Sequence, residues 1–127
     1  MEQKLKYKEW FFQSDYDLET AQQMLQSGRN VYCVFMCHLS LEKALKGLYV
    51  KKINEIPPKL HSLKYFVDKI QLDISDDYLL FIDKIDELSI ATRYPEDLKA
   101  MITLYTPEQT KKIYEQTKKI QQWLKQP

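Results

Sequence analysis

The chain of 127 residues has the length of one ordinary domain, and 44% of its residues are hydrophobic, so it can bury a single core. Its 19 basic and 18 acidic residues leave a net charge of +1, so bulk charge argues for neither a nucleic-acid nor a membrane partner and leaves a local charged patch open. The start of the chain lacks the apolar stretch of a signal peptide, and no apolar run approaches the roughly 18 residues that span a bilayer. We therefore expect one cytoplasmic domain over residues 1–127, with no membrane contact and with reduced cysteines.

The first half of the chain predicts two helices. Residues 3–26 form the first, with apolar side chains at loosely helical spacing and a stop signal at Ser27 and Gly28. These apolar side chains are Leu5, Phe12, Leu18, Ala21 and Leu25. Residues 30–53 form the second and most apolar helix, whose core-facing stripe follows a spacing of three and four. This stripe comprises Val31, Val34, His38, Leu41, Leu45 and Leu48.

The second half predicts two or three further helices. Two consecutive prolines in NEIPPKLHS end the second helix, and a short helix over residues 61–70 follows. Ser75 is a candidate N-cap for a helix that runs to about residue 92. TPEQ at 106–109 has the cap, the first-turn proline and the capping-box glutamine of a helix start, and this helix runs to about residue 125. No strand pattern competes, so the sequence predicts an all-α, antiparallel bundle of four to five helices.

The two cysteines and the neighbouring histidine raise the question of a metal site. Cys33 and Cys37 lie one turn apart on a helix, but His38 points about 100° away from Cys37, and a zinc site needs at least three protein ligands. Both cysteines also belong to a continuous stripe of small residues, which would let another helix approach closely. This stripe comprises Cys33, Cys37, Ser40, Ala44 and Gly47. Close helix packing is therefore favoured over a metal, and we expect neither a metal nor a cofactor.

The two histidines have more than one interpretation. His38 lies in the apolar stripe, so a buried, hydrogen-bonded side chain or a subunit contact is favoured over a catalytic role. His61 follows the two prolines and opens the third predicted helix. It is either a capping or turn residue, or a site residue that faces a groove between helices.

Lysines on two predicted helices could meet phosphates or only solvent. Glu42 and Lys46 form an acid–base pair one turn apart, and Lys43 adds positive charge beside them. A solvated helix face is the favoured interpretation, and a phosphate site is the alternative. In the last predicted helix, lysines alternate with Tyr114 and Trp123, a pattern that can bind single-stranded nucleic acid. An ordinary amphipathic surface helix has the same pattern, and this interpretation is favoured. These lysines are Lys111, Lys112, Lys118, Lys119 and Lys125.

Arg93 and Tyr94 stand where the fourth predicted helix must end, because Pro95 follows. The guanidinium fork of Arg93 suits a phosphate, and the ring of Tyr94 suits a stacked base. The structural alternative is a clamp in which Arg93 pairs with a carboxylate such as Glu42 or Asp17.

Four segments in this order and spacing resemble the HEPN domain, whose name stands for higher eukaryotes and prokaryotes nucleotide-binding. They are EWFFQSDYDLETAQQML, CHLSLEKALKGLYV, LHSL and ATRYPE. The resemblance covers about residues 8–125. It implies a helical bundle that dimerises through its central helices, which the stripe of small residues would suit. It also implies a partnership with a minimal nucleotidyltransferase, in some cases as a toxin–antitoxin pair.

Many HEPN proteins are metal-independent ribonucleases, whose motif is an arginine followed after four to six residues by a histidine. Here Arg93 is followed by YPEDLKAMITLY, which contains no histidine. The ribonuclease motif is therefore incomplete, and the sequence favours a binding module over an enzyme. We expect a homodimer that binds a nucleotide or RNA. Its candidate site residues are Glu42, Lys43, Lys46, His61, Arg93 and Tyr94. The alternatives are a ribonuclease with a displaced histidine and an interaction module without a ligand.

Overall fold

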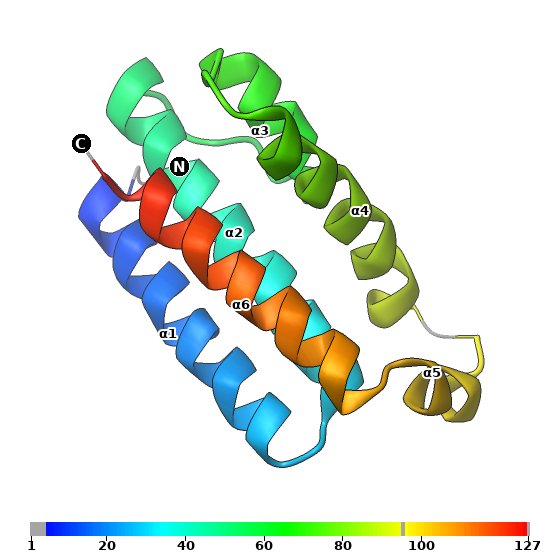
Figure 1. The fold of residues 1–127 in the computed structure, drawn as a ribbon. Coiled ribbons are helices and arrows are strands. Elements are labelled where there is room, and N and C mark those ends of the chain that lie inside the picture. Colours follow the sequence, from blue (N-terminus) through cyan, green and yellow to red (C-terminus); the bar gives the residue numbers. More distant parts are fainter. Residues whose placement is uncertain (1–4, 95, 127) are drawn as a thin grey trace.

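The computed structural model describes residues 5–94 and 96–126, which form six α-helices and no strand (Figure 1). The helices are α1 (Tyr7–Gln26), α2 (Asn30–Ile53), α3 (Leu63–Ile70), α4 (Asp76–Arg93), α5 (Leu98–Leu104) and α6 (Pro107–Leu124). The predicted all-α bundle is confirmed, with one short helix, α5, more than the sequence indicated. No helix in the described ranges combines the length and the apolar character that a membrane span requires.

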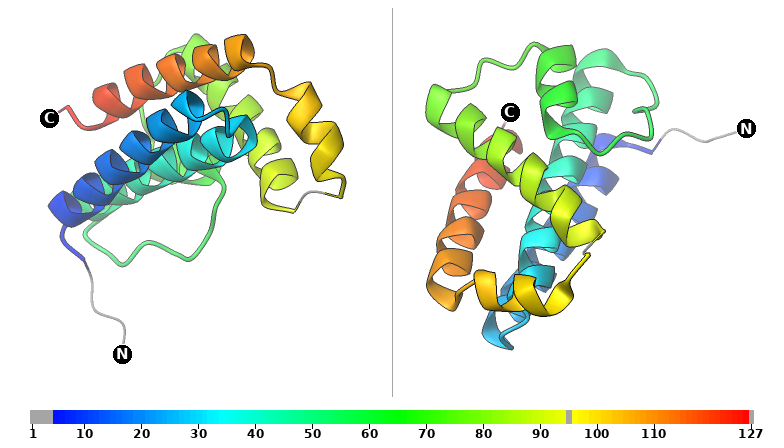
Figure 2. Two further views of the ribbon diagram at one scale, coloured as in Figure 1. Left: turned by 90° about the horizontal axis from the view of Figure 1, so that it is seen from below. Right: turned by 90° about the vertical axis from the view of Figure 1, so that its right-hand side faces the viewer.

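Helix α2 is the centre of the bundle, since it contacts each of the other five helices. Helices α1 and α6 lie beside it on one side, and α3 and α4 cover another side (Figures 1 and 2). The predicted stripe of α2 is buried, from Val31 to Leu48, and half of the other positions of this helix are buried too. Apolar burial on several sides of one helix is the main favourable term that holds the bundle together.

Local capping chemistry sets several helix ends where the sequence predicted them. The Ser75 hydroxyl accepts a hydrogen bond from the Tyr78 amide at 3.2 Å, and the Thr106 hydroxyl accepts one from the Gln109 amide at 3.2 Å. After α1, Gly28 adopts a φ of 79°, a left-handed conformation that glycine tolerates best.

The apolar face predicted for the first helix is partly wrong. Leu18 and Ala21 are buried, whereas Leu5 is 39% exposed and Phe12 is 65% exposed. The face of α1 that meets the bundle also carries the polar residues Ser14 and Asp17, whose side chains find partners there. Apolar spacing alone therefore assigned two exposed residues to this face and missed its two polar ones.

The stripe of small residues on α2 packs against α1. A Cβ atom on Gly47 would lie 2.6 Å from the Phe11 ring, and the hydroxyls of Ser14 and Ser40 each donate to the other residue's carbonyl, at 2.7 and 2.8 Å. The predicted close helix packing is thus confirmed within the chain. The expectation that this stripe would suit a dimer contact is wrong, because the stripe is buried inside the bundle.

Helix α5 was not predicted because nothing in it is buried. It begins at Asp97, whose carboxylate accepts a hydrogen bond from the Ala100 amide at 3.1 Å. Most of its apolar side chains face outward, with Ile102 58% and Leu104 68% exposed, whereas the partly buried Met101 packs against the Val31, Val34 and Tyr105 cluster. A helix without a core-facing stripe leaves no periodic signal in the sequence.

Candidate functional site

Three of the six candidate residues meet in a groove of about 360 Å³ between the turn before α3 and the last turns of α4. Its lining consists of His61, Ser62, Asp86, Glu87, Ser89, Ile90, Arg93 and Tyr94. A larger hollow of about 550 Å³ beside α4, α5 and α6 contains none of the candidate residues. The groove is therefore the candidate binding site, because it gathers residues that the sequence predicted for such a site.

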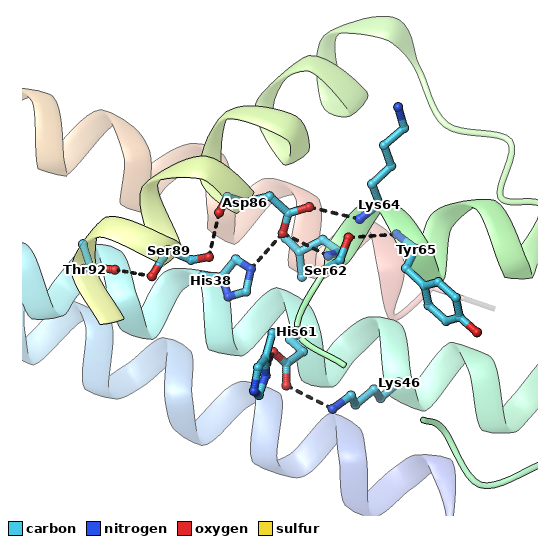
Figure 3. Close-up of polar contacts among 11 residues, drawn as sticks. His38, Lys46, His61, Ser62, Lys64, Tyr65, Asp86, Ser89 and Thr92 are labelled. Atoms are coloured by element: carbon cyan, nitrogen blue, oxygen red, sulfur yellow. Dashed lines mark hydrogen bonds and ion pairs between the residues drawn. The ribbon is translucent and has the colours of Figure 1, made fainter. Parts of the chain in front are cut away.

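Asp86 ties three helices together beneath the groove (Figure 3). Its Oδ1 atom lies 2.9 Å from His38 Nε2 on α2 and accepts a hydrogen bond from the Leu63 amide at 2.9 Å. Its Oδ2 atom accepts one from the Lys64 amide at 3.2 Å. Asp86 on α4 thus caps the first turn of α3 and fixes the turn that carries His61. The sequence analysis missed Asp86, because its partners are distant in the chain and leave no local pattern.

His38 is fully buried and hydrogen-bonded to Asp86, as the favoured interpretation held. It contacts a carboxylate rather than the cysteines. Among residues 5–94 and 96–126, no three His, Cys, Asp or Glu side chains gather as a metal site. The hydrogen bond with Cys33, together with burial, raises the pKa of the Cys37 thiol well above its ordinary value. This disfavours the thiolate that metal ligation requires.

Glu42 contacts His61 and is buried, with a side chain that is 5% exposed. Its Oε1 atom is 2.9 Å from His61 Nδ1, and its Oε2 atom accepts a hydrogen bond from Lys46 Nζ at 3.1 Å. In a neutral His61 ring, the carboxylate places the proton on Nδ1 and leaves Nε2 as an acceptor. His61 does not cap α3, since Ser62 and Asp86 do so.

The two candidate lysines are occupied elsewhere. Lys46 is buried against the Trp10 and Phe66 rings, at 5.8 and 5.7 Å from their centroids, and pairs with Glu42. Lys43 Nζ pairs with Asp17 on α1 at 2.8 Å. The favoured interpretation of a solvated helix face is wrong for Glu42 and Lys46, which are 4% and 7% exposed, because both are covered by neighbouring helices. Neither lysine lines the groove.

Arg93 lies in the last turn of α4, and its guanidinium has hydrogen-bond donors that no described residue uses. Its guanidinium carbon is 5.0 Å from the centre of the Phe35 ring, and its Nη2 atom is buried without a hydrogen-bond partner. Within the described ranges no carboxylate forms an ion pair with it. The suggested clamp to Glu42 or Asp17 is wrong, since these carboxylates hold His61, Lys46 and Lys43 instead.

Tyr94 forms the end of α4 and is 72% exposed. Its ring therefore offers an open face at the edge of the groove, beside Arg93. Pro95, which the sequence analysis placed at this helix end, lies outside the described residues.

The lysines of α6 form an ordinary solvated face. Lys111, Lys112, Lys118 and Lys119 are exposed, whereas Tyr114 is buried on the opposite side of the helix. Burial raises the pKa of the Tyr114 hydroxyl. The aromatic ring is therefore not interleaved with the lysines on one surface, and the favoured amphipathic interpretation is confirmed.

Comparison with known proteins places this geometry in a family. The family described as HEPN domain matches residues 7–126. The fold is similar to TT1696 from Thermus thermophilus, with a TM-score of 0.79 and 23% identity over 93% of this chain and 94% of that chain. It is also similar to ST0689, an archaeal HEPN homologue, with a TM-score of 0.76 and 22% identity over 95% and 96% of the two chains. No curated protein matches the sequence.

Proposed function

This chain belongs to the HEPN domain family, and we propose that it binds a nucleotide or RNA in the groove between the turn before α3 and the last turns of α4. One observation carries the proposal. Arg93 lines the groove with a buried nitrogen that no described residue satisfies. No described residue forms a hydrogen bond or an ion pair with the Arg93 guanidinium, so its donors stay available for an acceptor that enters the groove, and hydrogen bonds to a charged group are the strong ones.

The neighbours of Arg93 suit the rest of a nucleotide. A planar guanidinium binds phosphate oxygens in pairs. The exposed ring of Tyr94 offers a stacking surface for a base, which is worth roughly 1–3 kcal/mol per base. His61, held by Glu42 at 2.9 Å, presents its second ring nitrogen for a hydrogen bond. Phosphate, base and sugar would each have a partner of fitting chemistry.

The wider role follows from the family resemblance. We propose that the chain acts as a homodimer beside a minimal nucleotidyltransferase, in a toxin–antitoxin-like pair. Since the small-residue stripe is buried, a dimer needs another surface, and α4 and α5 expose apolar side chains suited to one. These side chains are Leu80, Ile90, Ile102 and Leu104. Sedimentation of the purified chain would test the dimer, and co-purification with the nucleotidyltransferase would test the pair.

Metal-independent RNA cleavage is the second candidate, because His61 and Arg93 line the same groove. His61 would take the proton of a 2′-hydroxyl, whose oxygen attacks phosphorus while the bond to the 5′-oxygen breaks. The departing 5′-oxygen takes a proton from water, and Arg93 stabilises the charge on the phosphorane. The products would be a 2′,3′-cyclic phosphate and a 5′-hydroxyl end. RNA that stays intact with the wild-type chain in EDTA would exclude this candidate.

Arg93→Ala provides the test of the binding proposal, measured by fluorescence anisotropy with a labelled short RNA. We expect affinity to fall by roughly tenfold to a hundredfold, because a charged hydrogen bond contributes about 1.5–3 kcal/mol. Arg93→Lys keeps the positive charge but not the forked guanidinium, so its affinity should lie between those of the wild-type chain and Arg93→Ala. The control is Arg29→Ala, which removes the other arginine of the chain from an exposed turn. Equal affinities for Arg93→Ala and Arg29→Ala, with both variants folded, would overturn the proposal.

A further inference from the structure

We infer that the groove selects a single phosphate group, in a nucleoside monophosphate or in one phosphodiester of RNA, and that Glu87 disfavours a triphosphate. This selectivity rests on the proposed function of the same groove. The argument depends on which charges line the groove and which of them are already paired.

Arg93 is the one permanent cation among the described residues that line the groove. The lining also contains two carboxylates, Asp86 and Glu87. Asp86 is engaged by His38 and by two backbone amides of α3. Glu87 is exposed, and no described residue forms a hydrogen bond or an ion pair with it. The lining therefore contains one arginine and one unpaired carboxylate, which leaves no surplus of positive charge for several phosphates.

The nearest lysines of α2 cannot supply the missing charge without breaking existing pairs. Lys43 is bound to Asp17 at 2.8 Å, and Lys46 is bound to Glu42 at 3.1 Å in a largely buried position. Releasing Lys46 would leave the buried Glu42 carboxylate with His61 as its one polar partner among the described residues, which is unfavourable.

The helix ends at the groove do not favour extra anionic charge either. The last turn of α4 contributes Ile90 and Arg93 to the lining, and the carbonyl end of a helix carries partial negative charge. The amide end of α3, which would attract a phosphate, is already capped by the Ser62 hydroxyl and the Asp86 carboxylate. The site thus lacks the open helix N-terminus that accommodates a polyphosphate elsewhere.

Glu87 should act as the residue that sets this selectivity. Each additional phosphate brings negative charge near its carboxylate, at a cost that corresponds to roughly threefold in affinity per charge at low salt. A ribose hydroxyl can instead donate a hydrogen bond to the same carboxylate, so a single nucleotide unit meets a compatible group.

The test is a calorimetric titration of the full chain with AMP, ADP, ATP and the dinucleotide ApA, at low salt in EDTA. We expect AMP or ApA to bind most tightly, with affinity falling by roughly threefold for each added charge. The stronger of AMP and ApA identifies the source of the phosphate. Glu87→Gln should reduce the difference between AMP and ATP, whereas Glu115→Gln, an exposed carboxylate on α6, should leave it unchanged.

Two results would overturn this selectivity, and they have different meanings. ATP binding as tightly as AMP to the wild-type chain would refute the selectivity while leaving the proposed binding function intact. A Glu87→Gln variant with unchanged discrimination would remove Glu87 from the account. If none of the four ligands binds, the proposed function itself fails, and the selectivity fails with it.

Discussion

Replacing Asp86 with alanine tests the network that holds the groove together. The variant removes the acceptor of the Leu63 and Lys64 amides and the partner of the fully buried His38 ring. Loss of capping costs about 1 kcal/mol, since the Ser62 cap of α3 remains. Leaving a buried imidazole nitrogen unsatisfied costs about 1–3 kcal/mol. We therefore expect a total loss of about 2–4 kcal/mol, a large part of the roughly 5–15 kcal/mol typical of a domain.

Chemical denaturation followed by circular dichroism measures this loss. Asp86→Asn keeps one oxygen as an acceptor and should lose less than Asp86→Ala. Asp83→Ala on the same helix is the matched control, because no described residue bonds to the Asp83 side chain, and it should change stability by less than about 0.5 kcal/mol. A loss below about 1 kcal/mol for Asp86→Ala, or one equal to that of Asp83→Ala, would refute the assigned role.

Three further predictions concern the bundle. Gly47→Ala gains roughly 1 kcal/mol of helix propensity but places a Cβ atom 2.6 Å from the Phe11 ring, so denaturation should show a lower free energy of unfolding than in the wild-type chain. A more stable variant would contradict the close packing of α1 against α2. Lys46→Met removes the lysine that pairs with the buried Glu42 carboxylate and should lower the free energy of unfolding by about 2 kcal/mol, whereas Lys52→Met, at an exposed position, should change it little. Equal losses in the two variants would contradict the burial argument. Burial raises the pKa of Tyr114 above 10.0, so the unfolded chain releases this proton first and the stability of the wild-type chain should fall as pH rises above about 10. The stability of Tyr114→Phe should fall less over the same pH range, and an identical decline would exclude this cause.

Much of the fold could be predicted because its signals are local. The bounds of α2 match the predicted 30–53, and the caps at Ser75 and Thr106 lie where short-range hydrogen bonding favours them. The family prediction is confirmed, since it depended on short motifs in a fixed order. Helix α5 escaped prediction because, apart from Met101, its apolar residues do not face the core, and repeated core-facing spacing is the signal that identifies a helix.

The candidate site was less accessible from the sequence because it is assembled by tertiary contacts. His61 and Arg93 were both named, but only the packing of α3 against α4 shows that they line one groove. The spacing of Glu42 and Lys46 predicted their pair correctly and their solvation wrongly, because burial depends on helices distant in the sequence. Asp86 gave no local signal, since its partners lie on α2 and α3.

The most direct test of the binding account is an NMR titration of the isotope-labelled chain with AMP. We predict that the largest shift changes occur at the Arg93 side-chain Nε–H, the His61 ring and the Tyr94 ring, and that Arg93→Ala abolishes them. Changes confined to the exposed lysines of α6, or the same changes in Arg93→Ala, would show that the nucleotide does not occupy the groove between the turn before α3 and the last turns of α4.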